Sequence, residues 1–274
     1  MRFRPCIDIH EGKVKQIVGA SLRDAVSDGE NGRGATENFV SEKDAAWYAS
    51  FYREKDLGGG HVIMLDHAGS PTYGETKAQA IGALLAWPGG MMAGGGITPE
   101  NASEFIDAGA ERVIVTSYVF RGGRIDMERL AVMEETVGRD RLVLDLSCRR
   151  VSAGTEANGS GRAGYIVATD RWQKLTDEEV TPELMERLAE HCAEFLVHAV
   201  DVEGKRAGID ETLVRLLAKG AKIPVTYAGG IGSVRDIETI GDLGEGRIDF
   251  TVGSALDIFG GELTLEEVLS AAGR

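Results

Sequence analysis

The 274-residue sequence has little of what builds disulfide frameworks, metal centres or membrane spans. Its three cysteines, Cys6, Cys148 and Cys192, stand far apart without a Cys-x-x-Cys pair, which argues against a disulfide framework or a structural zinc site. No apolar run is long enough to cross a bilayer, and the first residues lack the apolar region of a signal peptide. We therefore expect a soluble, cytoplasmic protein that holds no metal.

Positive charge is also scarce. Thirty Lys and Arg residues face 44 Asp and Glu residues, which gives a net charge of -14 at pH 7. Nucleic acids and membrane surfaces are anionic, so neither is an expected partner. A phosphorylated small molecule would need local positive potential, and the free N–H groups at helix starts provide it. The abundant residue is glycine, with 37 copies against six prolines.

Short apolar runs alternate with helical patterns along the chain. Most of the runs are continuous, as in parallel strands covered on both faces. About eight strand–helix units predict an α/β fold, a TIM (βα)8 barrel forming one domain over residues 1–274, with a doubly wound open sheet as the main alternative. The expected strands are residues 3–9, 61–66, 90–93, 112–117, 141–146, 194–200, 223–227 and 248–252.

Several helix boundaries have sequence signals. Thr98 and Thr181 each precede a proline, as an N-cap precedes proline at the first helical position. Ser41, with an acidic residue three positions later, resembles a capping box. Gly109 and Gly220 follow helical patterns, where a glycine that ends a helix belongs.

Two stretches interrupt the alternation. Residues 20–38 are rich in Gly, Asp, Asn and Ser, which predicts a long loop after the first strand. Residues 149–176 carry Asn-Gly-Ser-Gly between two short strand-like runs, which predicts a hairpin inserted after the fifth strand. Loops of this length inside a compact domain are often active-site lids, so we expect both to close over a ligand.

An internal repeat predicts that the barrel consists of two matched half-barrels. Similar features recur in the same order at about half the chain length, which chance similarity among Gly and Asp residues explains poorly. The matched pairs are Asp8 and Asp145, 137 residues apart, Asp66 and Asp201, 135 apart, Gly95 and Gly229, 134 apart, and Ser117 and Ser254, 137 apart.

Asp8 and Asp145 are the candidate catalytic residues. Each follows an apolar run, and half a barrel apart they would face each other across the mouth, where barrel enzymes place their chemistry. Two opposed carboxylates serve as general acid and general base when their surroundings separate their pKa values. A lone aspartate at a strand end would more simply cap or pair locally, so it is the symmetry that favours catalysis.

Each half also contains a candidate phosphate site. A glycine cluster precedes a helix start, and the following strand ends in serine. Glycine lets the backbone approach an oxyanion, and the helix start offers N–H groups. Ordinary tight turns use the same residues, so one such turn is weak evidence. Because the pattern occurs once in each half, it predicts a ligand with two phosphates. The predicted residues are Gly95, Gly96, Thr116 and Ser117 in the first half and Gly229, Gly230, Gly253 and Ser254 in the second.

Three further residues are candidates for substrate contact. His198 and Asp201 belong to the sixth strand segment, and His198 is equally well explained as a structural histidine. Trp172 lies at the end of the inserted hairpin, where its ring could stack on a planar heterocycle or pack within the loop.

The motifs resemble those of the phosphoribosylformimino-aminoimidazole carboxamide ribotide isomerases of histidine biosynthesis. The similarity covers nearly the whole chain. The Trp172 segment and the sequence around His198 resemble the eukaryotic-type branch of the family. The common bacterial branch has Thr-Asp in the strand where this sequence has His198-Ala199. The motifs are Arg4-Pro-Cys-Ile-Asp8-Ile-His-Glu-Gly12, His61-Val-Ile-Met-Leu-Asp66, Gly94-Gly-Gly-Ile97, Leu142-Val-Leu-Asp145, Ala228-Gly-Gly-Ile231 and Val252-Gly-Ser254.

The resemblance implies an aldose–ketose isomerase that performs an Amadori rearrangement without metal or cofactor. It implies that Asp145 is the acid that opens the ribose ring and Asp8 the base that removes the neighbouring proton. We expect a monomer. Three alternatives stay open: the cyclase subunit of imidazole glycerol phosphate synthase, a dual isomerase that also accepts phosphoribosyl anthranilate, and a non-catalytic phosphosugar-binding regulator.

Overall fold

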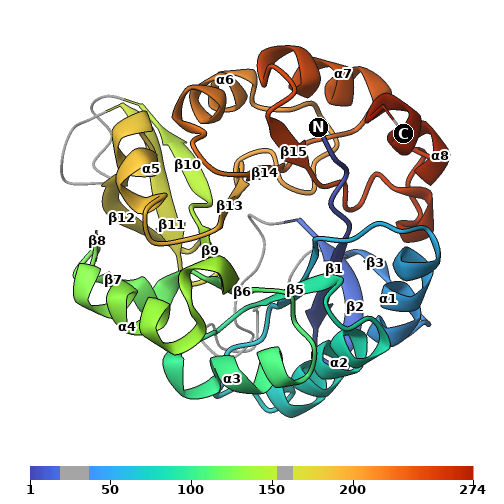
Figure 1. Ribbon diagram of the computed structural model, residues 1–274. Helices are drawn as coiled ribbons and strands as arrows, with labels where there is room; N and C mark the ends of the chain where they lie inside the picture. The colour runs from blue at the N-terminus through green and yellow to red at the C-terminus, as the bar shows by residue number, and fades with distance from the viewer. Residues whose placement is uncertain (19–36, 153–162, 274) are drawn as a thin grey trace, which may run out of the picture.

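The computed structural model describes residues 1–18, 37–152 and 163–273, and within them a ring of parallel strands is surrounded by helices (Figure 1). The strands follow the order β1-β4-β5-β6-β9-β13-β14-β15, all paired in parallel. They are β1 (Cys6–His10), β4 (Gly60–Met64), β5 (Met91–Gly94), β6 (Val113–Val115), β9 (Leu142–Asp145), β13 (Glu194–His198), β14 (Val225–Ala228) and β15 (Ile248–Phe250).

The first and last strand segments close the ring. Phe3 forms a parallel bridge with Phe250, and the Arg4 amide donates to the Phe250 carbonyl at 2.8 Å. In Figure 1 the blue N-terminal segment accordingly lies beside β15. The predicted TIM barrel is confirmed, all eight expected strands are present, and the doubly wound open sheet is wrong.

The outer ring consists of helices that follow the strands. The predicted N-caps Thr98 and Thr181 are confirmed, with Thr98 in a reciprocal capping box with Asn101. No helix of the described residues is both long and apolar enough to cross a membrane. The helices are α1 (Ala45–Glu54), α2 (Tyr73–Ala86), α3 (Pro99–Asp107), α4 (Met127–Val137), α5 (Pro182–Leu188), α6 (Glu211–Gly220), α7 (Val234–Leu243) and α8 (Leu265–Ala271).

Two of the predicted helix boundaries are wrong. Helix α1 begins after Asp44, whose carboxylate accepts from the Trp47 amide, whereas the Ser41 hydroxyl is bonded to Lys43 in the preceding turn. Asp44 is itself a strong N-cap, so it takes the role assigned to Ser41. Gly220 is the last residue of α6 rather than the residue after it, while Gly109 follows α3 with a φ of +106° as predicted.

Additional strands extend from the barrel mouth. Strand β2 (Lys13–Ile17) pairs antiparallel to β1, and β3 (Glu37–Val40) pairs antiparallel to β2, so both extend the sheet. The predicted insertion is a sheet of β10 (Cys148–Val151), β11 (Gly164–Thr169) and β12 (Lys174–Glu179), so the expected hairpin is present with a third strand. A small hairpin joins β7 (Phe120–Arg121) to β8 (Arg124–Ile125). Residues 20–36 and 153–162 of the two expected lids lie outside the described residues.

The core has two layers. The larger one packs the outward faces of the strands against the helices, and it includes Phe105, Phe195 and Tyr227. The smaller one fills the middle of the barrel with Met92, Ile114, Val143 and Leu196. The mouth above this inner layer is therefore closed from below by aliphatic side chains.

Charged side chains fill the opposite end of the barrel interior. Arg4 is buried, and its guanidinium lies 3.0 Å from Asp249 on β15 and 3.7 Å from Glu194 on β13. Glu194 also accepts from Thr226 at 2.8 Å and lies 3.3 Å from Arg112. These contacts join residues before β1 to three other strands, at the point where the ring closes.

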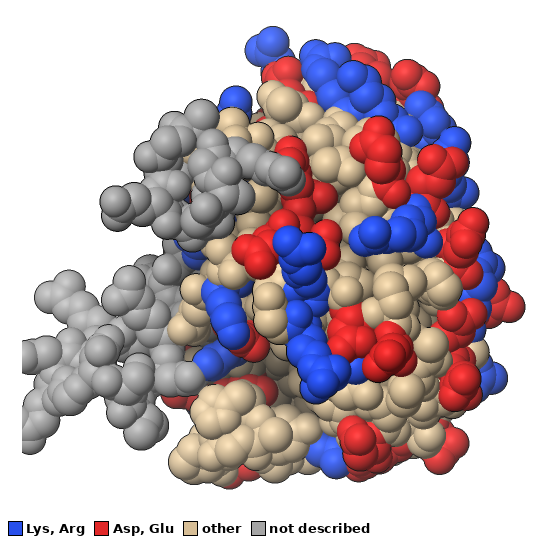
Figure 2. Space-filling view, turned by 90° about the vertical axis from the view of Figure 1, so that its left-hand side faces the viewer, with Lys and Arg blue, Asp and Glu red and all other residues tan. Residues whose placement is uncertain are grey.

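The outer surface mixes both signs of charge. On the face shown in Figure 2, acidic and basic side chains interleave, and the described residues drawn there form no continuous basic area.

Removing Arg4 tests how much the barrel depends on its closure. We expect Arg4→Met to lower the free energy of unfolding by about 3–5 kcal/mol, because Asp249 and Glu194 would each lose their buried cationic partner and keep only the less buried Arg2 and Arg112. Urea unfolding followed by circular dichroism measures this. Arg121→Met removes a solvent-exposed ion pair to Asp126 and is the control, with a much smaller change expected. Equal stability of the two variants would contradict the role given to Arg4.

Candidate active site

The mouth of the barrel contains a cavity of about 700 Å³ at the carboxyl ends of the strands. Asp8 from within β1 and Asp145 from the end of β9 both line it, as the repeat predicted. Predicted residues of the first phosphate site line it too, together with two candidates for substrate contact: Gly95, Gly96, Thr116, Ser117, Trp172 and His198.

A second, smaller cavity of about 30 Å³ belongs to the other half-barrel. The two cavities share three lining residues, Asp8, His198 and Glu203. The sequence-predicted residues of the second phosphate site all line the small cavity: Gly229, Gly230, Gly253 and Ser254. The structure thus gives each half its own group of predicted phosphate ligands, joined through residues near the axis.

The glycine turns of the two halves have matching backbones. Gly95 and Gly229 have φ values of +93° and +113°, and the glycines that follow them have +72° and +78°. A Cβ on Gly95 would lie 2.0 Å from the Met64 carbonyl oxygen, and one on Gly230 would lie 2.1 Å from the Gly208 carbonyl oxygen. Both turns therefore need glycine for conformation and for close approach.

Asp8 lies in a poorly solvated part of the mouth. Burial raises the pKa of its carboxyl to about 7, although a hydrogen bond from the Gln16 amide at 3.3 Å opposes the rise. Glu203 lies nearby, and burial raises its pKa to about 8, with the charge of Asp8 adding to the effect. Sequence reasoning missed Gln16 and Glu203, because neither belongs to a repeated pair.

Asp145 has a different environment. Its carboxylate accepts hydrogen bonds from the Ser147 amide, at 2.7 Å, and from the Ser147 hydroxyl. That hydroxyl also lies 2.9 Å from Nδ1 of His198, whose pKa is lowered by burial. Asp145 thus accepts two hydrogen bonds from one neighbouring residue, whereas Asp8 accepts one from the Gln16 amide.

Trp172 reaches the mouth from the turn between β11 and β12. Asp170, Arg171 and Trp172 all have positive φ values, between 51° and 63°, an uncommon run for residues other than glycine. The indole ring lies 5.1 Å from the His198 ring between centroids. Trp172 thus lines the large cavity next to His198, and its stacking on a heterocycle stays a prediction.

The two candidate serines are already bonded to nearby groups. Ser117 accepts from the Asp170 amide at 3.0 Å, and Ser254 accepts from Nε of Arg206 at 3.2 Å. Arg206 lines the small cavity and supplies a cation there that the sequence did not indicate. Asp201 lines neither cavity; its carboxylate accepts from the Arg150 amide at 2.8 Å, so it supports β10.

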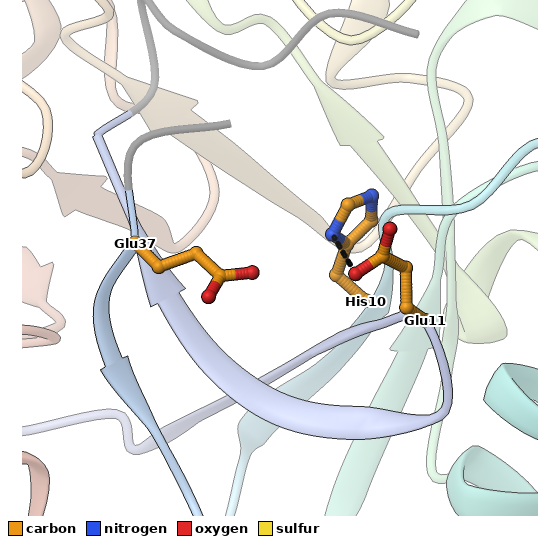
Figure 3. A group of neighbouring side chains, drawn as sticks. All are labelled: His10, Glu11 and Glu37. Carbon is orange, nitrogen blue, oxygen red and sulfur yellow. Dashed lines mark ion pairs between the residues drawn. The ribbon is translucent and has the colours of Figure 1, made fainter. Parts of the chain in front are cut away.

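His10, Glu11 and Glu37 could form a metal site by their ligand types; Figure 3 shows His10 and Glu11 at the turn after β1 and Glu37 across from them on β3. The ammonium of Lys15 lies 2.6 Å from a carboxylate oxygen of each glutamate. A side-chain cation thus already neutralises these carboxylates, and a metal ion would have to displace it.

Fold and cavities together define a TIM-barrel protein with an acidic cleft at the carboxyl ends of its strands. Residues 2–264 match the family described as "Histidine biosynthesis protein", and the chain belongs to that family.

Similar relatives carry the name 1-(5-phosphoribosyl)-5-((5-phosphoribosylamino)methylideneamino)imidazole-4-carboxamide isomerase. The Medicago truncatula protein, named as chloroplastic, is 50% identical over 98% of this chain and 81% of its own length. The Neurospora crassa protein is 47% identical over 97% and 96%, and the Saccharomyces cerevisiae protein 39% over 96% and 94%. One plant and two fungi agree with the eukaryotic-type resemblance of the motifs.

The duplicated glycine turns predict two anion sites. In crystals soaked with phosphate, we expect one ion near Gly96 and Ser117 and another near Gly230 and Ser254. Gly96 also permits a test in solution, because a Cβ there meets no atom within 4 Å. Gly96→Ala should weaken phosphate binding, measured by calorimetry, since the methyl group would stand where the oxyanion approaches.

Gly89→Ala is the matched control for this change. Gly89 has a φ of +75° and equally open surroundings, but it precedes β5 and lies at the other end of the barrel. Both alanines carry a similar left-handed strain of about 1–2 kcal/mol, so stability should fall alike. Unchanged phosphate affinity in Gly96→Ala, or empty turns in the soaked crystals, would count against the sites.

Proposed function

We propose that this chain catalyses the Amadori rearrangement of the phosphoribosylformimino-aminoimidazole carboxamide ribotide in histidine biosynthesis, as an aldose–ketose isomerase. The observation that carries the proposal is identity of 39–50% over 96–98% of the chain to proteins named as this isomerase. The placement of Asp8 and Asp145 on one cavity supports the same reaction.

The shape of the site suits a substrate with a phosphate at each end. We assign one phosphate to the turn at Gly95 and Gly96, with Ser117, and the other to the turn at Gly229 and Gly230, with Ser254. The reacting ribose then lies between them, beside the shared residues. Backbone N–H groups supply most of the positive potential in this acidic protein.

The chemistry needs one proton donor and one proton acceptor. We propose that Asp145 protonates the ribose ring oxygen, so that the bond from that oxygen to C1 breaks and leaves an iminium. Asp8 then removes the proton from C2, and the electron pair of that C–H bond forms the enolamine, which tautomerises to the aminoketose. No metal or cofactor takes part in these steps.

The surroundings of the two carboxyl groups bear on these roles. A base works best with a pKa near the operating pH, and that of Asp8 is raised to about 7. As the proposed acid, Asp145 must hold a proton when the ribose ring opens, and Ser147 bonds to its Oδ1. Protonated Glu203 limits the negative charge that the phosphates meet near neutral pH.

Compartment and assembly remain predictions. The name of the Medicago truncatula relative specifies the chloroplast, so the expected cytoplasmic location is a proposal. A single-domain monomer without nucleic-acid or membrane partners is proposed likewise. Incubating the purified protein with the ribotide, and in parallel with the cyclase substrate, tests the activity; conversion of the cyclase substrate alone would refute it.

Neutral amides at the two aspartates test their roles. We expect Asp8→Asn and Asp145→Asn each to lower turnover by at least about a hundredfold, because general acid–base steps contribute about 10²–10⁴-fold. Substrate affinity and fold should change little, since Asn keeps the shape of Asp. Turnover assays with equilibrium binding check this. A variant that kept a tenth or more of wild-type turnover would remove its residue from the mechanism.

The raised pKa values predict a narrow pH optimum. Below a pH of about 7 Asp8 is protonated and cannot accept a proton, so kcat/KM should fall. Above about 8 Glu203 ionises, and its charge repels the phosphates, so kcat/KM should fall again. Glu203→Gln stays neutral, and we expect it to lose the alkaline limb and keep the acidic one. An alkaline limb that persists in this variant would assign that limb to another group.

A further inference from the structure

A continuous series of hydrogen bonds connects Asp145 to His198, which lines both cavities. The Ser147 hydroxyl bonds to Asp145 Oδ1, and it lies 2.9 Å from Nδ1 and 3.1 Å from the backbone nitrogen of His198. Ser147 is fully buried, and His198 is 9% exposed. Asp145 ends β9, Ser147 follows it two residues later, and His198 ends β13.

The donors and acceptors in this series of hydrogen bonds have one consistent arrangement when Asp145 is ionised. A carboxylate only accepts, so the single hydroxyl hydrogen of Ser147 points to Asp145. The oxygen of Ser147 then accepts from the His198 amide and from Nδ1–H. This assigns the hydrogen of the neutral ring to Nδ1 and leaves Nε2 as an acceptor for groups in the cavities that His198 lines.

The histidine ring is held in place from two sides. The Trp172 ring lies 5.1 Å from it and the His61 ring 6.1 Å, between centroids. His61 is itself buried, and burial lowers its pKa to about 3, so it adds no positive charge near His198. The ring therefore has a fixed place between the cavities and Ser147.

The proposed isomerisation requires that Asp145 regain a proton, and this series of hydrogen bonds provides a path for it. Each turnover moves one proton from C2 to the ring oxygen, so Asp145 ends without its proton and Asp8 ends with an extra one. Before the next turnover Asp8 must lose a proton to solvent and Asp145 must gain one. Ser147 and its amide surround Oδ1 of Asp145, and they supply the route that leads from it to a titratable ring.

We propose that Ser147 and His198 return the proton to Asp145 after each turnover. A solvent proton binds Nε2 of His198, the Nδ1 hydrogen moves to Ser147 Oγ, and the hydroxyl hydrogen moves to Asp145. Asp145 is then protonated, Ser147 is again a hydroxyl, and His198 is neutral with its hydrogen on Nε2. The ring recovers its Nδ1 hydrogen by exchange with solvent. The inference rests on the proposed function.

Two substitutions interrupt the path at different points. Ser147→Ala removes the hydroxyl. His198→Asn keeps an amide N–H where Nδ1–H donates to Ser147, but it has no second nitrogen to take up a proton. Because the assigned arrangement has Asp145 ionised before substrate binds, we expect both variants to convert even the first equivalent of ribotide, with enzyme in excess, more slowly than the wild type does. Their steady-state kcat should fall by about tenfold or more, with KM little changed.

Chemical rescue separates a proton path from a merely structural role. Added imidazole should restore steady-state kcat in His198→Asn, because it can carry protons into the cavity. It should not restore Asp145→Asn. His191→Asn is the matched control: His191 lies outside the barrel, 2.9 Å from Glu134, and this variant should turn over normally with or without imidazole.

The nitrogen spectrum of the His198 ring gives a readout that does not depend on activity. In ¹⁵N NMR the wild-type ring should carry its hydrogen on Nδ1, and Ser147→Ala should shift it toward Nε2. A wild-type ring protonated on Nε2 would overturn the inference, as would unchanged steady-state kcat in both variants. Loss of kcat in His198→Asn that added imidazole leaves unrescued would do the same.

Failure of the proposed function would look different. In that case the wild-type protein itself would leave the ribotide unconverted, and the proton path would fall with it. With an active wild type, every result above bears on the proton path alone.

Discussion

The buried guanidinium of Arg4 is the contact on which the barrel most depends. It precedes β1, and it reaches Asp249 on the last strand and Glu194 on β13, so it joins the two ends of the sheet. Ionic contacts taken out of water are costly unless each charge has a partner, and here each partner comes from a different strand. The ring can satisfy these charges only when it is closed, which ties the register of the strands to closure.

Strand β13 shows how the closed end supports the open one. Successive inward side chains along it are Glu194 among the charges, Leu196 in the inner aliphatic layer and His198 at the mouth. Strand alternation gives these three residues one face, so the register that pairs Glu194 also sets the height of His198. The inner layer lies between these charges and the mouth, where burial raises the pKa of Asp8 to about 7 and that of Glu203 to about 8.

Much of the fold and of the candidate site could be predicted from the sequence, because parallel strands and a half-length repeat leave clear patterns. The eight strands, Asp8, Asp145 and both glycine turns follow from those patterns. Glu203, Gln16 and Arg206 do not, since they line the small cavity through tertiary packing, which no periodicity in the sequence reports. Asp201 illustrates the converse: it belongs to a repeated pair, yet its carboxylate supports a strand of the insertion instead of lining a cavity.

The insertion β10–β12 bears on the direction in which the substrate lies across the barrel mouth. Two equivalent half-barrels and a ligand with a phosphate at each end would permit two opposite binding poses, only one of which presents the ribose correctly to Asp8 and Asp145. Among the described residues, a three-stranded insertion of this kind follows β9 and no other strand of the barrel; its turn brings Trp172 to the large cavity, while the cavity at the second glycine turn is about 30 Å³. In the proposed function the heterocycle lies beside Trp172, and this gives the substrate one direction between the two similar half-barrels.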